Sequence, residues 1–270
     1  MNDFRITAVN IESIFGEYKQ NLENHIKWIE KHKDSQLILF PELSLSGYSS
    51  NPEELDALEN ETEQTLNELC ARTHDFPEIT VAVGTPLFKD QKIYIAHHLI
   101  RNGVIQHSHL KRILGPSEEN CFSSGSPANA INEYEVHRGI RIGIGIQICA
   151  ESHSPESSAR LADSGAGLLL MPFASPRETP VEKLTRFKKY LPARAYDNSC
   201  FLACCNLIRV GRKTGTAPGA AMIIGPRGDI LAETAASEEN SCTSRISPDE
   251  ILKIKDSSMG WFRSWRHIKD

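Results

Sequence analysis

Residues 140–149 read IRIGIGIQIC, and this stretch decides the class of fold. Isoleucine fills every second position and small or polar residues stand between, which is the two-residue period of a β-strand. After Cys149 comes a polar loop, and Ser154-Pro155 then suits an N-cap followed by proline at the first helical position. The pattern predicts a strand that delivers the thiol of Cys149 to a strand–helix turn. Ligands of open α/β sheets bind at such carboxyl ends of strands.

Two other predicted strands end in groups that a thiol nucleophile could use. Residues 36–40 form a short apolar run that leads into Pro41 and Glu42, and residues 104–110 read as a strand that leads into Lys111. Alone, a cysteine is usually a small buried hydrophobe, and a charged residue after a strand is usually solvated. Together, a carboxylate, an ammonium and a thiol at equivalent strand ends predict a reactive site.

The rest of the chain alternates predicted strands and helices, an α/β-like organisation. We expect strands at 4–10, 79–84, 93–100, 168–171 and 200–208, a hairpin at 221–233, and helices at 17–33, 61–73, 157–164 and 181–198, the last broken at Pro192. Gly143 and Gly145 lie on the strand face opposite the isoleucines, where they predict the close approach of a second sheet.

Composition fits a soluble cytoplasmic enzyme. The net charge of the 270 residues is −5 and no long basic run is present, so nucleic acid is not an expected partner. The N-terminus lacks the apolar core of a signal peptide, and no apolar stretch is long enough to span a membrane. Seven cysteines without disulfide-scaffold spacing indicate reduced thiols.

Five segments in order resemble the motifs of the nitrilase superfamily of carbon–nitrogen hydrolases. Any one segment is only weakly specific for this superfamily. The whole set in this order, spread over residues 4–235, is strongly specific for it. The segments are the glutamate motif at 39–48, Gly103 with Lys111, the nucleophile motif at 148–156 with Gly165-Ala166, a helix at 193–198 and a hairpin at 223–231.

The resemblance implies an α+β fold, a four-layer α-β-β-α sandwich, with residues 1–270 as one domain. It also implies a Cys–Glu–Lys triad that needs no cofactor or metal. Glu42 then takes the proton of the Cys149 thiol, because an unperturbed cysteine is mostly protonated at neutral pH. Lys111 stabilises the oxyanion of the tetrahedral intermediate. Glu118, seven residues before Gly125, has the spacing of a second family glutamate, although the adjacent Glu119 could also take that place.

Departures from the family pattern favour an amide as substrate. Ala150 stands where true nitrilases usually have tryptophan, and Ser152 and His153 stand where members acting on carbamoyl amino acids may have arginine. We therefore expect hydrolysis of a small linear amide through a Cys thioester, with release of ammonia or an amine. The alternatives are nitrile or carbamoyl hydrolysis, acyl transfer by the same triad, or a catalytically silent binding or assembly member.

Histidines offer two competing interpretations. His153 lies four residues after Cys149, so a papain-type Cys–His dyad is conceivable, although a polar loop histidine is commoner. His107 and His109 share one strand face and could ligate a metal. Without further ligands at zinc-like spacing, they are more typical of a surface pair.

Residues 256–270 form a C-terminal tail with three aromatic rings within five residues, at Trp261, Phe262 and Trp265. Exposed aromatics of that size are uncommon, and aromatic residues and arginine are enriched in protein interfaces. The family resemblance also implies dimers in which helices of two subunits pack together. We therefore expect a homodimer or higher homo-oligomer with this tail at an interface, the alternative being a monomer with the tail on its own surface.

Overall fold

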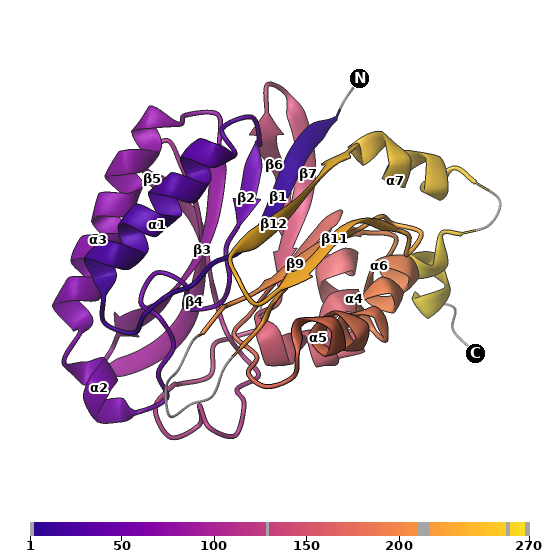
Figure 1. The fold of residues 1–270 in the computed structure, drawn as a ribbon. Coiled ribbons are helices and arrows are strands. Elements are labelled where there is room, and N and C mark those ends of the chain that lie inside the picture. Colours follow the sequence, from indigo (N-terminus) through magenta and orange to yellow (C-terminus); the bar gives the residue numbers. More distant parts are fainter. Residues whose placement is uncertain (1–2, 128–129, 210–216, 258–259, 268–270) are drawn as a thin grey trace.

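Two six-stranded mixed sheets form the centre of the protein (Figure 1). The computed structural model describes residues 3–127, 130–209, 217–257 and 260–267. In the first sheet three parallel strands, β1, β2 and β3, are flanked by antiparallel neighbours. Its strand order is β12 (Asn240–Ile246), β1 (Phe4–Asn10), β2 (Leu37–Leu39), β3 (Thr80–Lys89), β4 (Lys92–Arg101) and β5 (Val104–Leu110).

The second sheet repeats this plan, with β7, β8 and β9 parallel at its centre. The antiparallel strands β6, β10 and β11 complete it on either side. Its strand order is β11 (Ile230–Ala236), β10 (Gly219–Ile224), β9 (Phe201–Asn206), β8 (Leu168–Phe173), β7 (Ile140–Ile146) and β6 (Ile131–His137).

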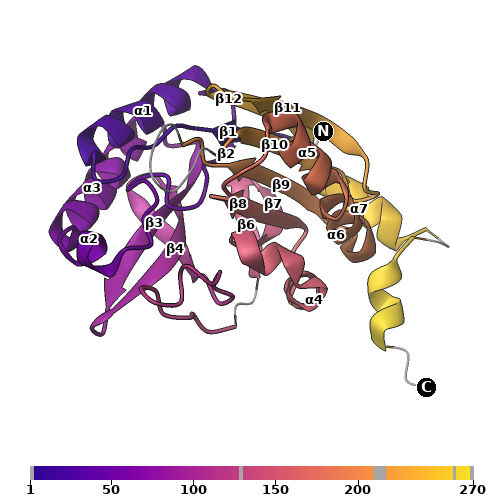
Figure 2. The ribbon, with the colours of Figure 1, turned by 60° about the horizontal axis from the view of Figure 1, so that its bottom comes forward.

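Helices cover the outer face of each sheet, as Figure 2 shows. On the first sheet lie α1 (Tyr18–Lys31) and α3 (Glu59–Arg72), whose apolar faces pack on residues such as Ile38 and Val81. On the second lie α4 (Pro155–Asp163), α5 (Pro180–Lys188) and α6 (Leu191–Asn198), which pack on residues such as Leu169 and Met222. The architecture is therefore the predicted four-layer α-β-β-α sandwich.

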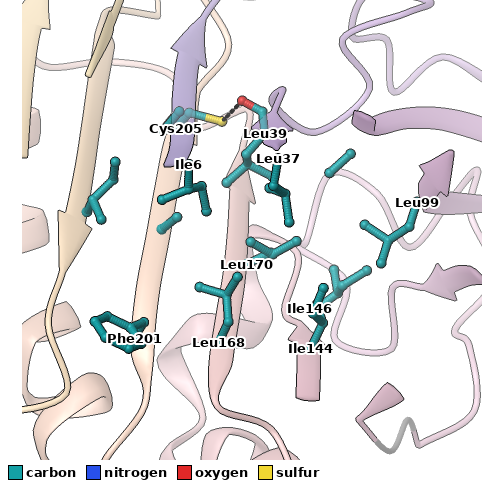
Figure 3. Close-up of a cluster of buried hydrophobic side chains, with 14 of the residues drawn as sticks. Ile6, Leu37, Leu39, Leu99, Ile144, Ile146, Leu168, Leu170, Phe201 and Cys205 are labelled. Atoms are coloured by element: carbon teal, nitrogen blue, oxygen red, sulfur yellow. Dashed lines mark hydrogen bonds between the residues drawn. The ribbon is translucent and has the colours of Figure 1, made fainter. Parts of the chain in front are cut away.

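The main core lies between the two sheets (Figure 3). Alternate residues of the parallel strands point into it, as expected for strands buried on both faces. The thiol of Cys205 crosses the interface and donates to the carbonyl of Leu39 at 3.5 Å. Residues labelled in the figure include Ile6, Leu37 and Leu99 from the first sheet and Ile144, Ile146, Leu168, Leu170 and Phe201 from the second.

Two expectations about the 140–149 stretch are wrong. The strand β7 ends at Ile146, and Cys149 instead begins the 3-10 helix η2 (Cys149–His153). The second sheet packs on the isoleucine face, not on the glycine face. A Cβ on Gly143 would lie 1.9 Å from the carbonyl oxygen of Gly165, and one on Gly145 would lie 3.0 Å from Leu161 of α4. Because these two glycines have no side chain, α4 and the turn that follows it can pack closely against the strand.

Most other elements lie where the sequence predicts them, and the 181–198 helix is broken into α5 and α6, with Pro192 in the first turn of the second. Elements not predicted are β6, β12, the helices α2 (Pro52–Asp56) and α7 (Pro248–Lys255), and the 3-10 helices η1 (Thr73–Asp75) and η3 (Phe262–His267). Over the described ranges, no helix combines the length and apolar character needed to cross a bilayer.

Candidate active site

Three chain segments bring the predicted site residues together at one end of the sandwich. Glu42 follows β2, Lys111 directly follows β5, and Cys149 comes three residues after β7. β5 runs parallel to β2, because two antiparallel pairings, β3 with β4 and β4 with β5, separate it from the β2–β3 parallel pair. The carboxyl ends of these strands therefore point the same way.

The ammonium of Lys111 is held between two carboxylates. Its Nζ donates to Oε1 of Glu42 at 2.6 Å and to Glu118 at 2.8 Å, and all three side chains are buried. Burial by itself would lower the pKa of Lys111, but the negative charges of Glu42 and Glu118, and that of Cys149 when it is ionised, outweigh burial and raise it. The lysine therefore remains a fixed cation at neutral pH.

Both carboxylate oxygens of Glu42 accept a hydrogen bond. Besides the contact from Lys111, Oε2 accepts the backbone N–H of Ala174 at 2.9 Å, and the carboxylate lies beside the thiol of Cys149. Burial raises the pKa of Glu42, the charge of Lys111 opposes that shift and the charge of Glu118 adds to it. A carboxylate with a raised pKa beside a thiol can accept a proton and later return it.

Cys149 has a backbone φ of +47°, in the left-handed region that residues other than glycine rarely adopt. Burial, followed by the charge of Glu42, raises the pKa of its thiol to about 12. The half-buried thiol is therefore protonated at neutral pH, and thiolate can form only as its proton moves to a neighbouring base. The backbone N–H of Ala174 lies near the sulfur and acts to lower the pKa of the thiol, so it favours the thiolate.

The structure separates the two adjacent glutamates that the sequence left open. Glu118 is buried and contacts Lys111, whereas Glu119 is exposed. Glu118 also accepts the backbone N–H of Gly115 at 2.7 Å and the hydroxyl of Tyr48 at 3.3 Å. These contacts fix the carboxylate beside Lys111.

The histidines considered as partners of the thiol or as metal ligands contact other residues. His153 stacks on Tyr190 with ring centroids 4.6 Å apart. His109 is buried rather than at the surface, and its Nε2 lies 2.7 Å from Oε2 of Glu151, so the expected surface pair with His107 is wrong. Within the part of the chain that the structure describes, no cluster of three or more His, Cys, Asp or Glu side chains could hold a metal ion.

A sequence profile of the carbon–nitrogen hydrolase family matches residues 5–256, which is nearly the whole chain. The chain belongs to the carbon–nitrogen hydrolase family. This assignment agrees with the resemblance seen in the motifs and with the four-layer fold.

Relatives of this hydrolase in sequence differ in length. A glutamine-dependent NAD(+) synthetase of Aquifex aeolicus is 29% identical over 265 residues, which cover 95% of this chain but 44% of that protein. The chain thus spans less than half the length of this relative. A 2-oxoglutaramate amidase of Bacillus subtilis is 26% identical over 264 residues, covering 93% of this chain and 94% of that protein.

Solved structures of the nitrilase superfamily share the fold. An amidase from Nesterenkonia superposes with a TM-score of 0.78 at 22% identity, covering 97% of both chains. Nit3 of Saccharomyces cerevisiae gives a TM-score of 0.78 at 21% identity, over 95% of this chain and 94% of that one. At this level of identity the likeness concerns the fold alone.

Four further residues lie at the candidate site of this carbon–nitrogen hydrolase, and none was singled out from the sequence. Ala174, Tyr48 and Arg209 surround the triad, and Glu151 supports the turn that carries the thiol. Tyr48 and Glu151 stood within recognised motifs, at 39–48 and 148–156, but neither had been given a role. Ala174 acts through its backbone N–H, which no side-chain pattern could reveal.

Proposed function

We propose that this protein hydrolyses a small linear amide through a thioester on Cys149. The observation that carries the proposal is the position of the Glu42 carboxylate, which contacts both the thiol and the ammonium of Lys111. One group can thus exchange a proton with the nucleophile while a fixed cation stays beside it. Strained backbone positions and groups with strongly shifted pKa values cluster at functional sites, and Cys149 has both features.

In the first half of the reaction, Glu42 takes the thiol proton as the sulfur of Cys149 attacks the carbonyl carbon of the amide. The ammonium of Lys111 stabilises the negative charge on the former carbonyl oxygen. Collapse of the intermediate breaks the carbon–nitrogen bond, and Glu42 returns its proton to the leaving nitrogen. The products of this half are ammonia or an amine and an acyl-thioester on the enzyme.

In the second half, Glu42 takes a proton from water, which attacks the thioester carbonyl. The carbon–sulfur bond breaks, the carboxylic acid leaves, and the proton returns to the sulfur of Cys149. Glu118 contacts Lys111 and not the thiol, so we assign it the task of holding the ammonium in place. Three members of this set are fully buried, which keeps their charges effective.

The activities named for two relatives support an amide over a nitrile. Glutamine and 2-oxoglutaramate, named in those relatives, are both primary amides, so ammonia is the leaving group when their amide bond is hydrolysed. The departures at Ala150, Ser152 and His153 noted in the sequence agree with this choice. Nitrile and carbamoyl substrates remain the alternatives that a substrate panel separates.

The test is release of ammonia from butyramide, propionitrile and a carbamoyl amino acid by the wild-type protein, with Cys149→Ala as the matched inactive variant. We expect ammonia from the amide, with equal amounts of carboxylic acid, and none from the variant. Ammonia from the nitrile alone would replace the amidase assignment. Equal activity of wild type and Cys149→Ala would refute the thioester mechanism.

A further inference from the structure

Arg209 is a buried arginine at the edge of the candidate active site. It follows β9 and is 8% exposed. Its guanidinium lies over the ring of Tyr48, 4.6 Å from the ring centroid, and its Nη2 donates to the carbonyl of Ala174 at 3.0 Å. The side chain is therefore held on two sides by the protein.

The guanidinium has no carboxylate partner among the described residues. Its Nε is buried without a hydrogen-bond acceptor in that part of the chain. The buried ammonium of Lys111 pairs with Glu42, and that of Lys183 pairs with Glu178 at 2.9 Å. Residues 210–216, which follow Arg209 in sequence, include no acidic residue. A buried and unpaired cation is costly, so this one calls for an anion from elsewhere.

Ala174 connects Arg209 to the reacting atoms. The backbone N–H of this residue donates to Glu42 at 2.9 Å and lowers the pKa of the nearby Cys149 thiol, while its carbonyl accepts from Arg209. Ala174 thus connects the guanidinium to the site, and the guanidinium interacts electrostatically with both Glu42 and Cys149. A substrate whose amide is at the thiol would extend only a short distance to reach it.

We propose that Arg209 binds a carboxylate on the acyl part of the substrate, so that the preferred substrates are short primary amides that carry a carboxylate at the other end. The planar guanidinium matches a carboxylate with two parallel N–H donors. A neutral amide leaves the buried cation unpaired and so binds less well. This inference rests on the proposed amidase function and names its substrate class.

A different role for Arg209 would be to offset the charges of Glu42 and Glu118 around the single ammonium of Lys111. In that case its loss would disturb the triad for every substrate alike. The two roles are separated by comparing a charged amide with a neutral one of the same length.

The experiment measures kcat/KM for succinamate and glutaramate, for their methyl esters, and for butyramide. The proteins are the wild type, Arg209→Gln, Arg209→Lys and the control Arg72→Gln, which removes an exposed arginine of α3. Thermal melting of each variant verifies its fold. In the Cys149→Ala background, calorimetry measures the binding of the better acid with and without Arg209→Gln, so that binding is read without turnover.

We expect the wild type to have a higher kcat/KM for at least one of the two acids than for the methyl ester of that acid. Arg209→Gln should lower kcat/KM for that acid about 100-fold more than it lowers kcat/KM for butyramide, as for a buried charge pair that loses one partner. Arg209→Lys should retain part of the preference, and Arg72→Gln all of it. In the Cys149→Ala background, Arg209→Gln should weaken binding of the acid by a similar factor.

Two results would overturn the inference: equal wild-type rates for an acid and its ester, or an equal loss for acid and butyramide in Arg209→Gln. Both leave the amidase proposal intact, because butyramide still releases ammonia. Absence of ammonia from every amide would refute the amidase function. The inference about Arg209 would then stand only if calorimetry shows that Arg209→Gln weakens binding of the acid in the Cys149→Ala background. Equal binding with and without Arg209→Gln would refute it.

Discussion

The carboxylate of Glu151 and the imidazole of His109 form a buried pair, with 2.7 Å between Oε2 and Nε2. The same carboxylate accepts the backbone N–H of Ile148 at 2.7 Å and that of Arg112 at 3.0 Å. Ile148 directly precedes the thiol residue, and Arg112 directly follows the lysine of the triad. One side chain of η2 therefore links the nucleophile turn to the lysine segment and fixes the distance between them.

Glu151→Gln should lower kcat by about tenfold or more, because a small displacement between reacting groups has a large effect on rate. The amide has one acceptor oxygen in place of two, so at least one buried N–H loses its partner, at a cost of about 1–3 kcal/mol. Steady-state kinetics and thermal melting measure both effects. The control is Glu156→Gln, an exposed glutamate in the first turn of α4. An unchanged kcat in Glu151→Gln would show that the link is not needed for catalysis.

Glu42→Gln should lower the rate by at least about a hundredfold, since the amide keeps the shape of the side chain but cannot accept the thiol proton. His153→Phe keeps an aromatic ring stacked on Tyr190 and should change the rate little. Ammonia release from butyramide measures both variants. The reverse outcome, loss of activity in His153→Phe alone, would establish the papain-type dyad in place of this mechanism.

Alkylation by iodoacetamide should reach Cys149 first among the seven cysteines, which are all free thiols. Cys121 is the matched control because it is half-buried in the same way but has no hydrogen bond with a carboxylate; its sulfur donates to the backbone carbonyl of Glu118 at 3.5 Å. Glu42→Gln should slow the labelling of Cys149 and leave that of Cys121 unchanged. Mass spectrometry of the labelled protein gives both rates, and faster labelling of Cys121 would refute the assignment of the nucleophile.

The pH profile should report the ionisation of Glu42. Catalysis needs this carboxylate ionised, so kcat/KM falls as the pH decreases through its pKa, which burial raises above 4.5. The charge of Glu118 also raises that pKa, so Glu118→Gln should move the acid limb to lower pH, whatever its effect on the maximal rate. The thiol, with a pKa near 12, should impose no alkaline limb in the neutral range. A shift of the acid limb to higher pH in Glu118→Gln would contradict this electrostatic account.

The sequence predicts the layers, and it singles out Glu42, Lys111 and Cys149, which the structure brings together, because strand alternation and family motifs are local patterns. It misplaces the end of β7 because alternation reports which side chains are buried, whereas the positive φ of Cys149 is a backbone property that leaves no such signal. The strands β6 and β12 have mixed polarity, and their antiparallel pairing with β7 and β1 places them at the sheet edges.

Contacts between distant segments explain the remaining differences. Glu151 meets His109 across 42 positions, and Arg209 meets Ala174 across 35. Neither relation has a period or a spacing that one sequence could reveal. The choice between Glu118 and Glu119 likewise depends on which side chain turns toward Lys111, which only the folded loop determines.

The C-terminal tail should take part in a homodimer or higher homo-oligomer. Its described part packs on the same chain, since Phe262 lies 5.2 Å from the ring of Tyr196 and Arg263 donates to carbonyls of the α4 region, yet Trp265 remains 52% exposed. Residues 258–259 and 268–270 lie outside the described residues, as do the side chains of 266 and 267. A tryptophan of that exposure, beside other aromatic rings, is typical of an interface.

Light scattering of the full chain, of a chain ending at residue 257 and of Trp265→Ser decides this prediction. We expect an oligomer for the full chain and weaker association in the other two, because removal of a large apolar contact raises the dissociation constant. The control is Val181→Ser, which removes an exposed apolar side chain of α5 and should leave the assembly unchanged. A monomeric full chain would refute the oligomer, while an oligomer of unaltered strength after truncation would show that the tail packs only on its own subunit.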